Sequence, residues 1–153
     1  MKNLKLIPIL LCIFMLNVAS MCSSDDDNSS TNVSQTEVFN TVSSGTWRIT
    51  LYNDSGTIKT SNFTGYNFTF SASGILTAAN VANTYSGTWS ISDSNSNDDT
   101  INDLNFNIAF STPAIFVDLT DDWHIQSRTA TKVEFIDVSG GNGGTDYLTF
   151  EKN

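Results

Sequence analysis

The feature that most constrains the fold is an alternation of apolar and polar residues with a period of two, which recurs after Gly45. Alternation of this kind places successive side chains on opposite faces of a strand, so that one face is buried and the other is wet. It predicts eight short antiparallel strands, of which the third has the weakest pattern. The runs are 47–51, 66–70, 75–79, 85–91, 104–110, 123–126, 132–135 and 148–151.

Turn-forming residues separate these runs, at 53–56, 73–74, 93–99 and 140–144. Short turns with no intervening helix favour an up-and-down meander. A meander of eight strands has two open edges and a broad apolar face, and closure into a barrel removes both problems. We therefore expect an all-β fold, an eight-stranded antiparallel up-and-down barrel, with a two-sheet β-sandwich as the alternative. The spacing of Val38 and Val42 predicts a short helical turn before the first strand.

The N-terminus has the pattern of a targeting segment. Lys2 and Lys5 precede the apolar run Leu6–Leu16, which has the length of a signal-peptide core and is too short to span a bilayer. The residues up to Cys22 resemble a lipobox, where bacterial lipoproteins are cleaved and lipidated on cysteine. The acidic stretch 23–27 resembles the surface-export signal of lipoproteins in Bacteroidota.

These resemblances imply three parts: a signal peptide at 1–21, the lipidated Cys22 with a disordered acidic tether at 22–36, and the barrel domain at 37–153. The polar tether buries too little apolar surface to order itself. The implied location is the outer membrane, with the lipid anchor as the membrane contact and the domain exposed at the cell surface.

Charge and cysteine usage exclude several classes of function. The mature chain would keep five basic and 16 acidic residues, a net charge of −11, which repels nucleic acid. Cys12 and Cys22 both lie before the domain, so disulfides, thiolate metal sites and cysteine nucleophiles are excluded within it. We expect a monomer with no cofactor.

The stretch Gly45-Thr46-Trp47 resembles the Gly-X-Trp signature of lipocalins and related calycins. In that family the glycine permits a tight entry, and the tryptophan closes the barrel base under a basic side chain from near the chain's end. The candidates for that side chain are Lys152 and Arg128. The resemblance spans 42–153 and implies a small apolar or amphipathic ligand inside the barrel.

The predicted ligand-binding residues are aromatic side chains that alternation places on one face. They are Tyr66, Phe68, Phe70, Tyr85, Trp89, Phe106, Phe110 and Trp123. Two interpretations stay open: these rings fill the core, or some of them line a cavity open at one end. The alternative function is a non-catalytic surface module that binds glycan or another envelope protein through loops, with Tyr52, Asn53, Asp54 and 93–99 as candidates.

No constellation for catalysis or metal binding emerges. His124 is the single histidine, faces away from Trp123 by alternation, and has no strand-turn-helix elbow to present a serine to it. One histidine also excludes multi-histidine zinc sites. The loop 93–99 resembles a calcium loop, but Asp98 stands where a glycine is needed and Leu104 where a bidentate glutamate is needed. A solvated hairpin is favoured there, and a weak calcium site stays open.

Overall fold

The computed structural model describes residues 35–93, 104–139 and 143–153. All of the described residues belong to one compact unit, Thr31–Asn153. The predicted signal peptide, Cys22 and nearly all of the tether and of the 93–99 loop lie outside the described residues. Among the described helices, none is long and apolar enough to cross a bilayer.

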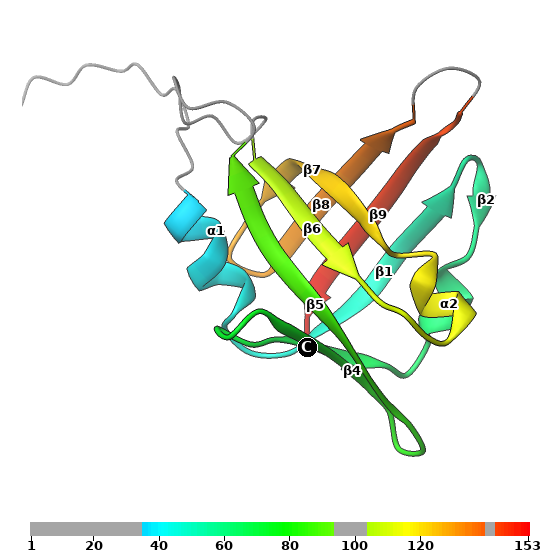
Figure 1. Cartoon of the computed structure of the whole chain (residues 1–153), viewed down its shortest axis with the longest axis horizontal. Coiled ribbons are helices and arrows are strands. Elements are labelled where there is room, and N and C mark those ends of the chain that lie inside the picture. Colours follow the sequence, from blue (N-terminus) through cyan, green and yellow to red (C-terminus); the bar gives the residue numbers. More distant parts are fainter. Residues whose placement is uncertain (1–34, 94–103, 140–142) are drawn as a thin grey trace, which may run out of the picture. The chain divides into compact units, whose positions relative to one another are not determined.

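Short strands make up most of the described chain (Figure 1). The elements in order are α1 Gln35–Val42, β1 Trp47–Asp54, β2 Thr57–Ile58, the 3-10 helix η1 Thr60–Phe63, β3 Asn67–Phe70, β4 Ile75–Ala79, β5 Thr84–Asp93, β6 Leu104–Ala109, α2 Ala114–Val117, β7 Asp121–Arg128, β8 Lys132–Val138 and β9 Thr145–Lys152.

The sheet closes on itself. From β3 to β9 each strand pairs with the next in antiparallel fashion, and β1 pairs with both β3 and β9. The β1–β9 ladder runs from Trp47↔Lys152 to Asn53↔Tyr147, whereas β1 and β3 meet through Trp47↔Phe68. The two-residue β2 folds back and pairs antiparallel with the end of β1. The predicted eight-stranded up-and-down barrel with a short preceding helix is confirmed, and the sandwich alternative is wrong.

Burial follows the predicted alternation except on β1 and at Thr149 of β9, which is 6% exposed between the buried Leu148 and Phe150. Leu51 was expected inside, but it is 36% exposed, whereas Tyr52 is 2% exposed. The cause is an irregularity in the β1–β9 pairing between Ile49 and Leu51. A bulge there adds one residue to β1 and reverses the faces that follow it. The prediction of Tyr52 as a loop contact residue is therefore wrong, because its side chain belongs to the core.

The start of β1 is held against α1 and the chain's end. Gly45 has a φ of +82°, a conformation that glycine adopts without steric cost, and it leads the chain tightly into β1. The indole Nε1 of Trp47 donates to Val42 O at 2.9 Å. Lys152 Nζ lies 5.0 Å from the centre of the Trp47 ring, within cation–π distance. Of the two candidates for a basic side chain over Trp47, Lys152 lies there, while Arg128 hydrogen-bonds to Thr41 on α1.

Two short helical elements lie in loops where no helix was predicted. η1 carries Phe63, α2 carries Phe116, and Leu119 follows α2; all three side chains are at most 2% exposed. Each element has four residues, which is too short to display helical periodicity in the sequence. The barrel interior therefore includes rings that come from loops as well as from strands.

The bulge can be tested with two substitutions on one strand. Ile49→Ala should lower the free energy of unfolding by about 2–4 kcal/mol, because Ile49 is buried and leaves a cavity. Leu51→Ala should cost less than about 1 kcal/mol, because its side chain is partly in solvent. Urea unfolding of both variants measures the difference. Equal losses would mean that the alternation continues through Leu51 and that the bulge is absent.

Candidate functional site

The barrel interior, where a ligand site was predicted, is occupied by contacting rings. Of the predicted ligand residues, Tyr85 is half-buried and the other seven are at most 9% exposed. Phe70 lies near the centre, with ring centroids 5.5 Å from Trp89, 5.6 Å from Phe106 and 5.3 Å from Phe150. Contacts at these distances are those of a packed aromatic core.

The second group of rings, which we call the Phe116 cluster, surrounds the side chain delivered by α2. The ring centroids of its members lie 5.1–6.1 Å from that of Phe116, and the members are Phe63, Tyr66, Phe68, Tyr85 and Phe110. Gly87 makes room for this packing, since a Cβ there would lie 2.8 Å from the Phe110 ring. Phe116 therefore fills the space that four of the predicted ligand residues would otherwise enclose.

The polar groups of the buried indoles are satisfied within the protein. Trp89 Nε1 donates to Ser71 O at 2.9 Å, and Trp123 Nε1 donates to Leu119 O at 3.0 Å. The Tyr52 hydroxyl donates to Asp118 O at 2.5 Å. Burial, aided by the carboxylates of Asp54 and Asp118, raises the pKa of the Tyr52 phenol and keeps it a donor. These groups stabilise the core and are not directed at a ligand.

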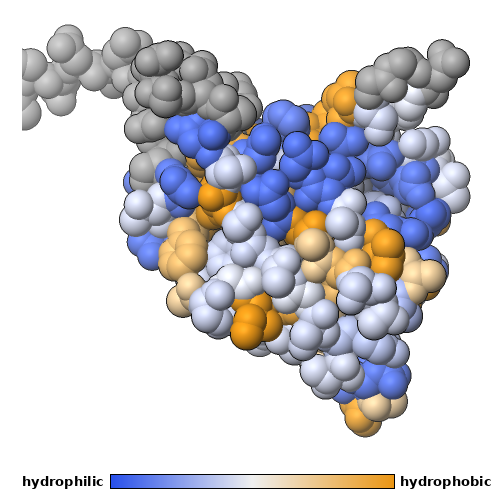
Figure 2. All heavy atoms as spheres, in the orientation of Figure 1, coloured by the Kyte–Doolittle hydropathy of each residue, from blue (hydrophilic) through white to orange (hydrophobic). Residues whose placement is uncertain are grey.

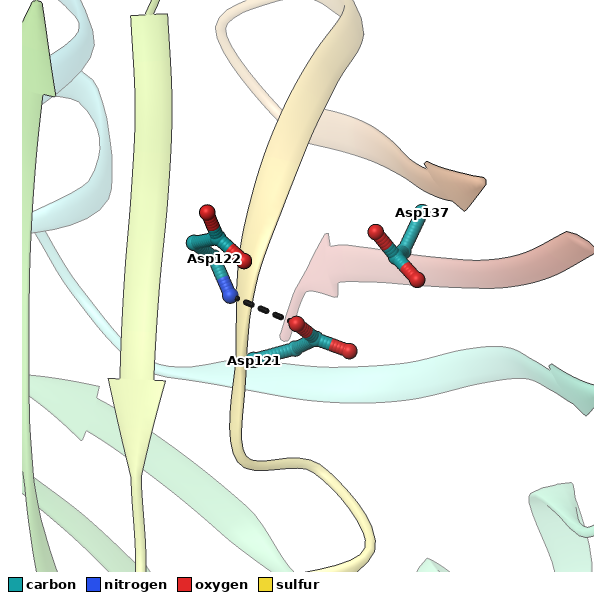
Figure 3. A group of neighbouring side chains, drawn as sticks. All are labelled: Asp121, Asp122 and Asp137. Carbon is teal, nitrogen blue, oxygen red and sulfur yellow. Dashed lines mark hydrogen bonds between the residues drawn. The ribbon is translucent and has the colours of Figure 1, made fainter. Parts of the chain in front are cut away.

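Three carboxylates, which we call the acidic cluster, meet at one rim of the barrel. They are Asp121 and Asp122 at the start of β7 and Asp137 near the end of β8 (Figure 3). One oxygen of each lies within 4.8 Å of the others. The Asp122 N–H donates to the Asp121 carboxylate at 2.9 Å. Asp121 and Asp122 are adjacent in the sequence, whereas Asp137 joins them only through the pairing of β7 with β8.

The protein's described cations are engaged elsewhere. Arg48 pairs with Glu151, and Lys59 pairs with both Asp54 and Asp118. Arg128 pairs with Glu37, and Lys132 pairs with Glu134. Lys152 lies over Trp47. No lysine or arginine of the described residues therefore neutralises the acidic cluster.

The pKa of the Asp121 carboxyl is raised in this environment. Burial is the main cause that raises its pKa, and the charges of Asp137 and Asp122 add to it, while the Asp122 N–H acts in the opposite sense. A carboxyl with a raised pKa destabilises the fold once it ionises, so the burial of ionised Asp121 beside two other carboxylates is a cost at neutral pH.

Carboxylate oxygens are ligands for hard cations, so the acidic cluster is the group of described residues that could contact Ca²⁺. Ca²⁺ takes about six to eight oxygens, and three carboxylates with one oxygen each supply at most half of them. We assign no metal to the acidic cluster. Most of the predicted 93–99 calcium loop lies outside the described residues.

Hollows lie on the outer wall of the barrel and beside α1. One, which we call the β7–β8 groove, has a volume of about 420 Å³ and is lined by His124, Ile125, Gln126, Ile136 and Val138. A second of about 490 Å³ lies along β5 and β6, around Ser86, Thr88 and Ala109. A third of about 250 Å³ lies between α1 and β5, against Phe39 and Trp89. The predicted outward position of His124 is confirmed, since its side chain is exposed.

Asp121→Asn should stabilise the barrel at pH 7, by up to about 1 kcal/mol, the scale of a partly exposed charge interaction. The gain should disappear below about pH 4, where the carboxyl is protonated in the unfolded chain as well. Urea unfolding at both pH values measures it. The control is Glu151→Gln, which removes a carboxylate paired with Arg48 and should not stabilise. A loss of stability in Asp121→Asn at pH 7 would contradict the repulsion.

No protein-family model and no curated protein matches the chain. Among solved structures, the chain is similar to a crystal structure described as a DUF4847 family protein from Bacteroides vulgatus ATCC 8482. The TM-score is 0.50 and the sequence identity 18%, with 76% of this chain and 97% of that chain covered. At this identity the likeness shows the fold alone, a β-barrel that the other chain shares over nearly its whole length.

Proposed function

We propose that the mature chain is a lipid-anchored lipoprotein of the bacterial outer membrane, and that its barrel is a non-catalytic binding module that meets its partner on the outer wall. The apolar segment 6–16, Cys22 and the acidic stretch 23–27 support the anchor and the surface location. The position of Lys152 over Trp47 supports the lipocalin-like resemblance.

The filled interior is the observation that carries the proposal. Residues from strands and loops pack there with at most 2% exposure, and the largest are Trp47, Trp123, Tyr52, Phe63, Phe68, Phe70, Phe106, Phe116, Phe135, Phe150, Leu76 and Leu119. An eight-stranded barrel is just wide enough either to be filled by side chains or to hold one small ligand. Here the described side chains fill it, which leaves the outer wall as the surface for recognition.

A non-catalytic role fits the surroundings of His124. Its side chain is exposed on β7, and no serine or threonine hydroxyl of the described residues hydrogen-bonds to it. Nucleophilic catalysis requires a base within hydrogen-bond reach of the nucleophile and oriented by a third group. A histidine in solvent with no such neighbour supports a binding function.

A small apolar ligand inside the barrel is the second candidate, and the Phe116 cluster favours it. Phe116 comes from a four-residue helix, so its ring could leave the interior without disrupting the sheet. The space it vacates would be walled by Phe63, Tyr66, Phe68, Tyr85 and Phe110. Under this candidate the ligand replaces Phe116, and binding requires the displacement of α2.

Native mass spectrometry of the mature chain distinguishes the two. After incubation with a lipid extract of the host, the wild-type barrel should retain no small molecule, because its interior is filled. Phe116→Ala should lower stability by about 3–5 kcal/mol and open a cavity that takes small apolar molecules. The milder Phe116→Leu covers the case in which the alanine variant does not fold. A molecule retained one-to-one by the wild type would contradict the solid core and favour the second candidate.

Cys22→Ser should move the protein from the membrane to the soluble fraction of a Bacteroidota host, because the acyl chains that anchor it would be lost. Cys12→Ser is the matched control, since Cys12 lies in the segment expected to be cleaved, and it should leave the protein in the membrane. Fractionation and labelling with radioactive palmitate measure both. Membrane retention of Cys22→Ser would contradict the anchor.

A further inference from the structure

One side of the barrel wall carries no charged side chain. No aspartate, glutamate, lysine, arginine or histidine occurs in 60–92 or in 104–117, although the whole chain has a net charge of −9. These stretches include β3, β4, all of β5 but its last residue, and β6, and each of these strands pairs with the next. In Figure 2 the surface where β4 and β5 run is mostly pale, whereas the strongly hydrophilic residues are concentrated above it. We call this side the uncharged wall.

The hollow of about 490 Å³ along β5 and β6 lies on the uncharged wall, and we call it the β5–β6 hollow. Ile75, Thr88 and Ala109 are cross-strand neighbours on β4, β5 and β6, and Ile75 is 48% exposed. Ser86 lies two residues before Thr88, about 7 Å along β5, and Ser111 lies two residues after Ala109. The hollow thus places a mostly apolar row beside a row of hydroxyls.

The hydroxyl groups of the β5–β6 hollow are available to a ligand. No hydrogen bond joins the hydroxyl of Ser86, Thr88 or Ser111 to another of the described residues. Further along β5, by contrast, Asn107 Nδ2 donates to Ser90 Oγ at 3.2 Å. Each free hydroxyl both donates and accepts, so the hollow offers several hydrogen bonds at positions fixed by the sheet.

These properties select the chemical class of the ligand. A charged ligand would lose hydration at the uncharged wall without meeting an opposite charge, which is unfavourable. A purely apolar ligand would cover the hydroxyls without replacing their hydrogen bonds to water. A sugar ring carries hydroxyl groups at its edge and C–H groups on its faces, so it matches both rows of the hollow at once.

We propose that the β5–β6 hollow binds a neutral saccharide, whose sugar ring places C–H groups on Ile75 and Ala109 and hydroxyl groups against the free hydroxyls of the hollow. This inference rests on the proposed outer-wall function and names the ligand class for it. A polysaccharide presents the same unit many times, so several anchored copies of the chain can bind one polymer and gain avidity from weak individual sites.

The probes are maltohexaose, mannohexaose, xylohexaose and the N-acetylglucosamine trimer, each titrated into the mature chain carrying Cys22→Ser and followed by amide NMR shifts. At least one of them should shift the amides of 75–77, 86–88 and 109–111. Its affinity should change little with salt, because no ion pair forms. Trigalacturonate, an acidic oligosaccharide, should bind more weakly than that probe, because the acidic protein repels it.

Matched variants locate the contact. Thr88→Val keeps the shape of the side chain but removes its hydroxyl, so it should weaken binding about threefold to tenfold, whereas Thr88→Ser should keep most of the affinity. Ile75→Ser should weaken binding about fivefold through lost apolar contact. Thr57→Val is the control, because Thr57 is exposed on β2, outside the hollow, and should leave affinity unchanged. All three positions are exposed, so the variants should keep the wild-type melting temperature.

Several outcomes would overturn the saccharide assignment. The first is the absence of shifts in the amides of the hollow with all four probes at millimolar concentration, and the second is equal affinity of Thr88→Val and the wild type. Shifts by phosphatidylethanolamine vesicles and by no saccharide would make the uncharged wall a lipid contact. Saccharide shifts confined to another part of the outer wall would contradict the hollow but leave the proposed function standing. A one-to-one apolar ligand in native mass spectrometry would instead contradict the proposed function.

Discussion

Closure of the sheet through the β1–β9 ladder is the constraint on which the rest of the structure depends. Without the pairs from Trp47↔Lys152 to Asn53↔Tyr147, β1 and β9 would be two open edges. Closure also fixes the volume of the interior, because strand number sets barrel diameter. That volume has to be packed at the density of a protein core, which explains why so many aromatic side chains point inward and why the loops contribute Phe63 and Phe116 as well.

The same closure determines which surfaces of the described barrel reach solvent. With its interior filled, the barrel offers its outer wall and rims, and there the unneutralised charge gathers at Asp121, Asp122 and Asp137. The described cations serve internal purposes: Arg128 ties α1 to the barrel, Lys59 joins β1 to the segment after α2, and Lys152 covers Trp47. Their use in these contacts leaves the three carboxylates at one rim without a lysine or arginine partner among the described residues, which is a cost to stability at neutral pH.

Alternation in the sequence was enough to predict the strands, the closed barrel and the outward side of His124, because each depends on a local period and on the need to hide edges. It failed at Leu51, since a bulge is set by how β1 pairs with β9, a strand about 100 residues away. Alternation did not predict that Phe116 fills the interior, because a helix of one turn is too short to leave a periodic pattern in the sequence. It did not join Asp137 to Asp121, since only the register between β7 and β8 does so. Whether the aromatic residues bind a ligand depends on packing, which the pattern of letters does not contain.

Amide hydrogen exchange of the mature chain tests the closed, filled barrel most directly. The account predicts that paired amides of β1 and β9, such as those of Ile49 and Phe150, exchange only through global unfolding, with the same opening free energy as the amides of β6 and β7. Exchange of the β1 and β9 amides at an opening free energy far below that of β6 and β7 would contradict it, because those strands would then be edges of an open sheet.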